Sequence, residues 1–215
     1  MRIDVVFDTV CPWCYVGKRR LERALSSRPE LKVALRWQPF LLNPDMPEGG
    51  IERRAYLERK FGGGHRVQQM FGAIIAAGQA EDIPFAFDKI DRAPDSVASH
   101  RLIRYAGRFG HDAAAVEAVF DAYFVKGRDI GALDVLVAIG ESLGIESNGL
   151  CAYLKSDEDV ATIHADNTRA HRLGVSGVPS YLFDGVFALA GAQETDIFLR
   201  LLDLARENEA ALPVS

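Results

Sequence analysis

Two cysteines near the N-terminus of the sequence have a spacing that supports chemistry. Cys11 and Cys14 enclose Pro12 and Trp13 in the stretch DTVCPWCYVG. A pair of thiols at this spacing can exchange electrons with a disulfide, bind a metal ion or pack without reacting. Which of the three applies depends on the elements that position the pair.

The residues on either side of the cysteines predict a tight turn from a strand into a helix. Residues 2–7 are mostly apolar, as in a strand covered on both faces, and residues 17–27 place their leucines on one helical stripe opposite their arginines. With a helix that begins at Pro12, Cys11 becomes the N-cap residue and faces backbone N–H groups that favour a thiolate. We therefore expect Cys11 to attack a disulfide and Cys14 to resolve the mixed disulfide.

The side chains between the cysteines suit this geometry. Pro12 fixes φ at the first helical position, and Trp13 offers an aromatic surface beside the sulfur atoms. Inert packing is a weaker interpretation, because core cysteines have no reason to lie on both sides of a strand-to-helix turn. A structural zinc site is also weaker, because the sequence has no second C-x-x-C or H-x3-H pair to complete a tetrahedral site. We expect no metal and no resident cofactor, with glutathione as the one candidate co-substrate.

Composition favours a globular protein whose partners are small molecules or proteins. The chain has 215 residues, of which 48% are hydrophobic, and a formal net charge of -5 from 25 basic and 30 acidic side chains. Without a long basic block or an apolar run of roughly 18 to 20 residues, nucleic-acid and membrane partners are not expected. The N-terminus lacks the apolar segment of a secretory signal and the cysteine count of 3 is odd, so we expect a reducing, cytoplasmic location.

Strand patterns occur at both ends of the chain, and helices are expected between them. Residues 31–42 alternate apolar and polar side chains, and Asp184 with Gly185 predicts a hairpin between two short strands. The expected helices cover residues 51–61, 65–80, 95–109, 112–126, 132–143, 148–155, 157–173 and 194–209. The first of them carries a face that we interpret as solvated, made of Arg53, Arg54, Arg59 and Lys60.

Three stretches of the sequence form a recognisable set: DTVCPWCYVG at 8–17, DSVASHRLI at 95–103 and GVSGVPSYLFDGVFALAGAQ at 174–193. Together they resemble the DsbA-like thioredoxin-fold family, especially its FrnE-like cytoplasmic branch. The resemblance implies an α/β, thioredoxin-like fold with a large inserted helical domain. It implies a thioredoxin-like domain made of residues 1–42 and 156–215, and an inserted helical domain made of residues 43–155.

The resemblance also implies roles for residues far from the cysteines in sequence. It implies a cis peptide bond between Val178 and Pro179, next to the cysteine pair, where the backbone of Val178 can meet a bound peptide or thiol. His100 lies in the second stretch, where its side chain either lines the substrate cleft or is satisfied structurally. Ser96 is expected to cap the same helix. The expected substrate-binding residues are Pro12, Trp13, Val178, Pro179 and His100.

Three functions remain open at this point. The leading one is a thiol–disulfide oxidoreductase that acts on protein or small-molecule disulfides and is recycled by a separate reductant or oxidant. The second is a glutathione-dependent isomerase or transferase of the hydroxychromene-carboxylate isomerase or kappa type, although such proteins carry serine where this chain has Cys11. The third is a peptide-binding chaperone module whose thiols are incidental.

Overall fold

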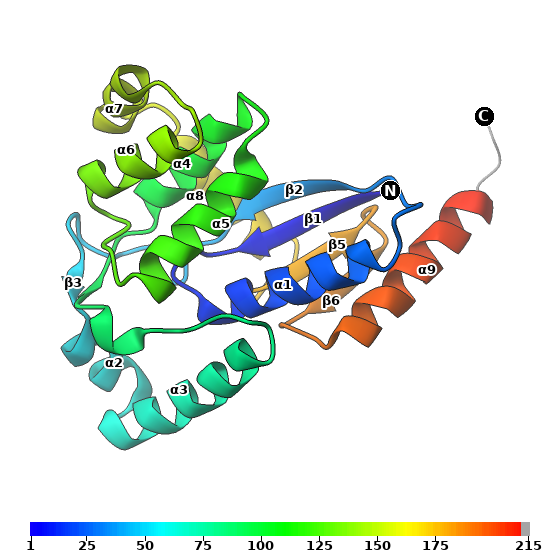
Figure 1. Cartoon of the computed structure of the whole chain (residues 1–215), viewed down its shortest axis with the longest axis horizontal. Helices are drawn as coiled ribbons and strands as arrows, with labels where there is room; N and C mark the ends of the chain where they lie inside the picture. Colours follow the sequence, from blue (N-terminus) through cyan, green and yellow to red (C-terminus); the bar gives the residue numbers. More distant parts are fainter. Residues whose placement is uncertain (212–215) are drawn as a thin grey trace.

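A four-stranded sheet lies at the centre of the computed structural model, which describes residues 1–211 and the side chains of residues 1–208 (Figure 1). The strand order is β2-β1-β5-β6. Strand β1 pairs in parallel with β2, and β1-β5 and β5-β6 are antiparallel pairs. The strands are β1 (Arg2–Phe7), β2 (Ala34–Pro39), β5 (Ser180–Phe183) and β6 (Phe187–Ala190). The two ends of the chain therefore build one sheet.

Helices cover both faces of this sheet. Helices α1 (Pro12–Ser26) and α9 (Thr195–Ala211) pack together on one face, and α8 (Val160–Arg172) contacts β2 on the other, where Figure 1 shows it behind the strands. Strand β1 serves both layers, since Val5 belongs to the main core whereas Val6 packs with Ala170 of α8. The expected strand with two covered faces is confirmed.

The helical block lies between β2 and α8 in sequence and beside one end of the sheet in Figure 1. Its main helices are α2 (Arg53–Phe61), α3 (Gly64–Gln79), α4 (Val97–Gly107), α5 (Asp112–Phe120), α6 (Leu133–Ser142) and α7 (Ser147–Lys155). All six expected helices of this block are present, with shifted ends. The arrangement matches the thioredoxin-like fold, while the domain boundaries at 43 and 155 stay a prediction.

The structure adds three short features that periodicity could not predict. Strands β3 (Ile51–Glu52) and β4 (Arg92–Ala93) form a two-residue ribbon, which is too short to show an alternating pattern. The helix expected at 112–126 ends at Phe120, and a π-helical turn, η2 (Asp121–Val125), follows it. A single 3-10 turn, η1 (Phe87–Lys89), precedes β4.

The start of α4 differs from the expectation. Ser96 has helical backbone angles (φ -83°, ψ -5°) and its hydroxyl makes no capping hydrogen bond. Instead, Oδ1 of Asp95 accepts from the backbone N–H of Val97 at 3.1 Å. The prediction that Ser96 caps this helix is wrong, because Ser96 already has helical backbone angles and the side chain that accepts from the first turn belongs to the preceding residue, Asp95.

The predicted hairpin at Asp184 and Gly185 is confirmed, with a longer loop than the sequence pattern indicated. Asp184 (φ 50°) and Gly185 (φ 76°) have left-handed backbone angles, but three residues, 184–186, separate the paired Phe183 and Phe187 where two were expected. Among residues 1–211, the structure contains no helix with the length and hydropathy required to cross a membrane.

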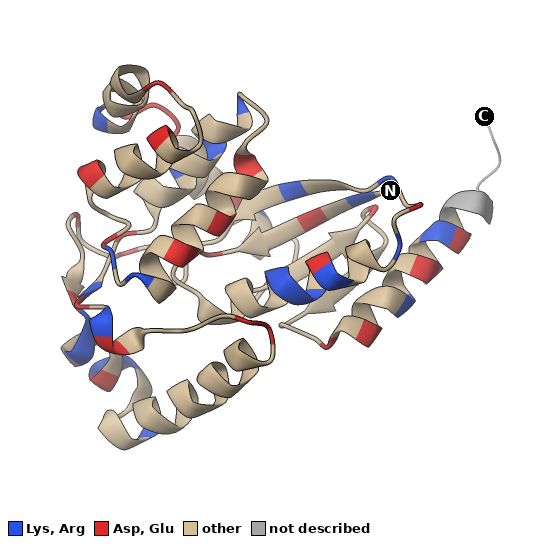
Figure 2. Cartoon of the chain, in the orientation of Figure 1, with Lys and Arg blue, Asp and Glu red and all other residues tan. Residues whose placement is uncertain are grey.

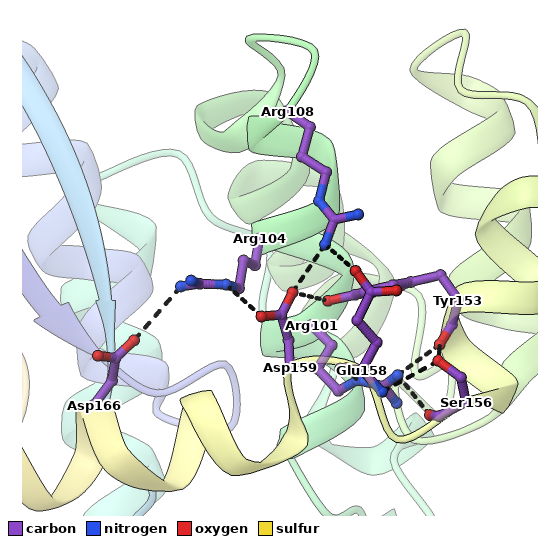
Figure 3. Close-up of polar contacts among 8 residues, drawn as sticks. All are labelled: Arg101, Arg104, Arg108, Tyr153, Ser156, Glu158, Asp159 and Asp166. Atoms are coloured by element: carbon purple, nitrogen blue, oxygen red, sulfur yellow. Dashed lines mark hydrogen bonds and ion pairs between the residues drawn. The ribbon is translucent and has the colours of Figure 1, made fainter.

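Arginine side chains on α4 join the helical block to α8 (Figure 3). The guanidinium of Arg101 is buried and stacks over the ring of Tyr153, 4.9 Å from its centroid. It also donates to four backbone carbonyls at 2.6 to 3.1 Å, those of Tyr153, Leu154, Ser156 and Glu158. Arg101 thereby ties α4 to the end of α7 and to the turn that leads into α8.

Two further arginines on α4 extend this contact with carboxylates. Arg104 pairs with Asp159 at 3.1 Å and with Asp166 at 3.6 Å. Arg108 pairs with Asp159 at 3.0 Å, and the hydroxyl of Tyr153 donates to the same carboxylate at 2.9 Å. Asp159 thus collects three donors, all visible in Figure 3.

Candidate active site

The cysteine pair sits where β1 turns into α1. Cys11 has an extended backbone (φ -97°, ψ 110°) and is the N-cap residue, and Pro12 occupies the first helical position. The N–H of Cys14 donates to the carbonyl of Cys11 at 3.0 Å, and the N–H of Cys11 donates to the carbonyl of Asp8 at 3.1 Å. The predicted strand-to-helix turn with Cys11 at its corner is confirmed.

Both thiols are free, and they differ in their surroundings. Both are buried, with 5% of Cys11 and 3% of Cys14 exposed, and the Sγ of Cys11 donates to the carbonyl oxygen of Val178 at 3.6 Å. Burial, and after it the neighbouring Cys11 sulfur, raises the pKa of the Cys14 thiol well above its ordinary value. Cys14 therefore holds its proton at neutral pH.

The loop before β5 brings a proline against the start of α1. The peptide bond between Val178 and Pro179 is cis, as the resemblance implied. Gly17 makes the close approach possible: a Cβ on this residue would lie 3.1 Å from Cγ of Pro179 and 2.2 Å from the hydroxyl of Tyr181. Segments more than 160 residues apart in sequence are thus in direct contact at the dithiol.

A small cavity of about 240 Å³ opens beside the cysteine pair. Cys11, Pro12 and Trp13 line one side of it. The other walls are mainly apolar and include the aromatic residues Tyr56, Phe61, Phe71, Phe87, Tyr123 and Phe124. Arg53 and Lys60 also line it, whereas none of the lining residues in the described part of the chain is Asp or Glu. The cavity can hold one compact apolar group next to Cys11.

Val178 and Pro179 border a different hollow. It has a volume of about 620 Å³ and lies between α8 and the sheet, where residues of β1, β5 and β6 form its floor. The two hollows come together at the contact between the Cys11 thiol and the Val178 carbonyl. Of the predicted substrate-binding residues, Pro12 and Trp13 therefore face one hollow, and Val178 and Pro179 face the other.

His100 lies away from both hollows. Its side chain is 1% exposed, its Nε2 is 3.5 Å from Oδ1 of Asp8, and its ring packs edge-on against Phe7 at 5.1 Å. Asp8 in turn accepts from the N–H of Leu42 at 2.7 Å. The structure places His100 beneath the turn that carries Cys11, and a role for it in binding substrate stays a prediction.

Two site residues escaped the sequence reasoning. Asp8 is fully buried three positions before Cys11, and its place inside the DTVCPWC stretch was the available signal. Arg53 was expected on a solvated face, and this is wrong: it is half-buried and its guanidinium lies over the ring of Phe71 at 5.0 Å. Its spacing of four from Leu57, which also lines the cavity, was the overlooked pattern.

A mixed sheet with a dithiol at the start of its first helix, and a cis-proline loop against that dithiol, defines a thioredoxin-fold protein. The chain belongs to the DSBA-like thioredoxin domain family, whose model matches residues 2–203. Membership of this family supports an oxidoreductase or isomerase role.

Solved structures agree with the assignment. A probable DsbA oxidoreductase from Streptomyces coelicolor is 27% identical with a TM-score of 0.89, covering 100% of this chain and 93% of that one. A 2-hydroxychromene-2-carboxylate isomerase has a TM-score of 0.74 at 19% identity, covering 99% and 100%. The cytosolic disulfide reductase DsbM from Pseudomonas aeruginosa, solved with GSH, has a TM-score of 0.70 at 21% identity, covering 96% and 100%. The last two likenesses concern the fold.

Proposed function

We propose that this protein is a thiol–disulfide oxidoreductase in which Cys11 is the nucleophile and Cys14 is the resolving thiol. The observation that carries the proposal is the asymmetry of the pair. Cys11 is the N-cap residue of α1 and lines a cavity, whereas Cys14 is enclosed and its pKa is raised by burial. A helix N-terminus favours the thiolate form at the position of Cys11. A protonated Cys14 is a poor nucleophile, so it does not attack the substrate disulfide itself.

The reaction follows in two balanced steps. The Cys11 thiolate attacks one sulfur of a substrate disulfide, a protein–substrate mixed disulfide forms, and the other half of the substrate leaves as a thiolate. Cys14 then loses its proton and attacks the Cys11 sulfur, so the second half leaves and a Cys11–Cys14 disulfide remains. The protein has donated two electrons, which an external thiol must restore. We place this activity in a reducing compartment, as a reductase or isomerase.

A second candidate is a glutathione-dependent isomerase. It is supported by the fold likeness to 2-hydroxychromene-2-carboxylate isomerase and by a cavity that suits a small molecule. In such a reaction Cys14 has no chemical task, so the second thiol counts against this candidate.

Reduction of insulin, followed by turbidity with dithiothreitol as the electron source, tests the proposal. Cys11→Ser should slow the reaction by at least about a thousandfold, because the nucleophile is lost. Cys14→Ser should stop at the mixed disulfide, which mass spectrometry detects as an adduct on Cys11. Insulin reduction that survives Cys11→Ser contradicts the dithiol mechanism.

The alternatives give different results in the same samples. Turnover of a glutathione-dependent isomerisation that is unaffected by Cys14→Ser would support the isomerase. Suppression of aggregation by both serine variants, without any insulin reduction by the wild type, would instead indicate a peptide-binding module.

A further inference from the structure

One cation in the cavity beside Cys11 has no acidic partner. The guanidinium of Arg53 lies over the rings of Phe71 and Phe87, at 5.0 and 5.5 Å from their centroids, and Nη1 donates to the carbonyl of Phe87 at 3.1 Å. Across residues 1–208, no Asp or Glu side chain forms an ion pair with it. Burial lowers the pKa of Arg53, because a guanidinium among aromatic rings loses hydration, and its interaction with the Tyr123 hydroxyl offsets only part of that loss.

A second cation stands at the rim of the same cavity. The Nζ of Lys60 donates to Oδ1 of Asn43 at 2.6 Å and to the hydroxyl of Tyr56 at 2.8 Å, both neutral groups. Figure 2 shows basic residues crowded on α2, whereas the neighbouring α3 carries a single one, Arg66. The cavity is therefore positively charged in a chain whose formal net charge is -5.

The dimensions of the cavity restrict the body of the ligand. A volume of about 240 Å³ lies below the roughly 300 to 1,000 Å³ of sites for drug-sized ligands. Apolar and aromatic walls suit a planar or apolar group, and Cys11 forms part of the wall. A single ring or a short apolar chain fits this space. A carboxylate on the ligand would pair with the guanidinium of Arg53, which has no acidic partner among the side chains of residues 1–208.

We propose that the substrate bound against Cys11 is a small disulfide with an apolar or aromatic body and a carboxylate, and that Arg53, assisted by Lys60, recognises the carboxylate. This inference rests on the dithiol function proposed above and names its substrate class. The carboxylate pairs with the guanidinium of Arg53 while the apolar body packs against the stacked rings of Phe71 and Phe87. Cys11 then attacks the disulfide sulfur, and Cys14 completes the two-electron transfer, releasing both halves as thiols.

Two chromogenic disulfides separate recognition of charge from reaction of the thiol. The anionic aromatic probe is 5,5′-dithiobis(2-nitrobenzoate), and the neutral aromatic probe is 4,4′-dithiodipyridine. Second-order rate constants with the pre-reduced protein are measured for both, and their ratio corrects for any general loss of reactivity. Arg53→Gln should lower the anionic-to-neutral ratio about tenfold, and Lys60→Gln should lower it by about two- to threefold.

Arg54→Gln is the matched control. Arg54 is the next residue on α2, its side chain is 85% exposed and pairs with Glu58, and it does not line the cavity. Its removal takes away the same charge at a screened position, so the ratio should stay within about twofold of the wild type. Arg53→Lys keeps the positive charge and should recover most of the anionic-to-neutral rate ratio. Such a recovery would show that the loss in Arg53→Gln comes from the missing charge and not from disturbed folding.

The outcomes separate failure of this inference from failure of the proposed function. An equal ratio in the wild type, Arg53→Gln and Arg54→Gln, with normal reaction of the neutral probe, overturns carboxylate recognition and leaves the dithiol chemistry intact. Equal rates for the wild type and Cys11→Ser with the neutral probe overturn the proposed function itself. A tenfold fall confined to Arg53→Gln supports the inference.

Discussion

The arginines of α4 and the arginine at the start of α2 have opposite electrostatic surroundings. The guanidinium of Arg101 donates hydrogen bonds to four backbone carbonyls, and Arg104 and Arg108 both pair with the carboxylate of Asp159. Arg53 is half-buried, and its surroundings are one carbonyl, the Tyr123 hydroxyl, two aromatic rings and no acid among the described residues. The first set holds helices together, and the second leaves charge available for a ligand.

The same contrast extends to neutral polar groups. Among the side chains of residues 1–208, buried polar atoms without a hydrogen-bond partner include the Tyr181 hydroxyl and Nε2 of His100, both close to the dithiol region. No such atom belongs to the α4 arginine contacts of Figure 3. An unpaired buried polar group costs roughly 1 to 3 kcal/mol, so these two atoms lower stability where the α4 arginine contacts raise it.

Removing Arg101 should produce the largest change in stability. Arg101→Ala leaves four carbonyls without their donor and opens space under Tyr153, so the free energy of unfolding should fall by about 3 kcal/mol. Urea denaturation measures it. The reaction of Cys11 with 4,4′-dithiodipyridine in the folded protein should keep its rate.

Arg108→Gln is the control for that prediction. Arg108 is 43% exposed, so its loss should lower the free energy of unfolding by less than about 1 kcal/mol. If both variants lose the same free energy of unfolding, the four carbonyl contacts of Arg101 do not contribute the stability predicted for them.

A methyl group at Gly17 should destabilise the contact between α1 and the cis-proline loop. In Gly17→Ala the new Cβ would lie 2.2 Å from the hydroxyl of Tyr181, which is buried and cannot swing away. We expect a loss of about 2 kcal/mol in the free energy of unfolding, together with slower reaction of Cys11. Gly72→Ala on α3, where a Cβ meets nothing within 4 Å, should be stabilising by about 0.5 to 1 kcal/mol. Equal melting temperatures for the two alanine variants would contradict the close approach.

Alkaline pH should weaken the fold through the dithiol region. The pKa values of Cys14 and Tyr181 are raised, chiefly by burial, so the folded protein keeps protons that the unfolded chain loses. Stability is therefore full below the unfolded pKa values, near 8.5 for cysteine and 10 for tyrosine. It should fall above them by about 1.4 kcal/mol per pH unit for each group until the folded group titrates. Urea midpoints at pH 8 and pH 10.5 measure this slope, and a slope that Cys14→Ala leaves unchanged would contradict the assignment to Cys14.

Deleting two tyrosine hydroxyls should give the smallest effects, with different sizes. Tyr153→Phe loses the hydrogen bond to Asp159 at 2.9 Å and should cost about 1 kcal/mol in unfolding free energy. Tyr181→Phe removes a hydroxyl that has no partner among the described residues, so it should be neutral or slightly stabilising. A larger loss for Tyr181→Phe than for Tyr153→Phe would reverse the comparison between the two regions.

Much of the fold was accessible before the structure. The motif around Cys11, the hairpin at Asp184 and the helix periods were correct because each depends on contacts within a few residues along the chain. Ser96 shows the limit of the same reasoning, since Asp95 and Ser96 are both good capping residues and the sequence pattern does not decide at which of them the helical backbone begins.

The sequence by itself determined the chemistry that this protein can offer: two thiols at the corner between a strand and a helix, with Pro12 setting the helix start. Only the tertiary structure decided what surrounds them. In the tertiary structure Val178 contacts the Cys11 sulfur and Cys14 is buried. Arg53, which was expected on a solvated face, lies over an aromatic ring of the cavity instead. The physical reason is that burial and unmatched charge depend on which distant segments pack together, and no local period along the chain records that packing.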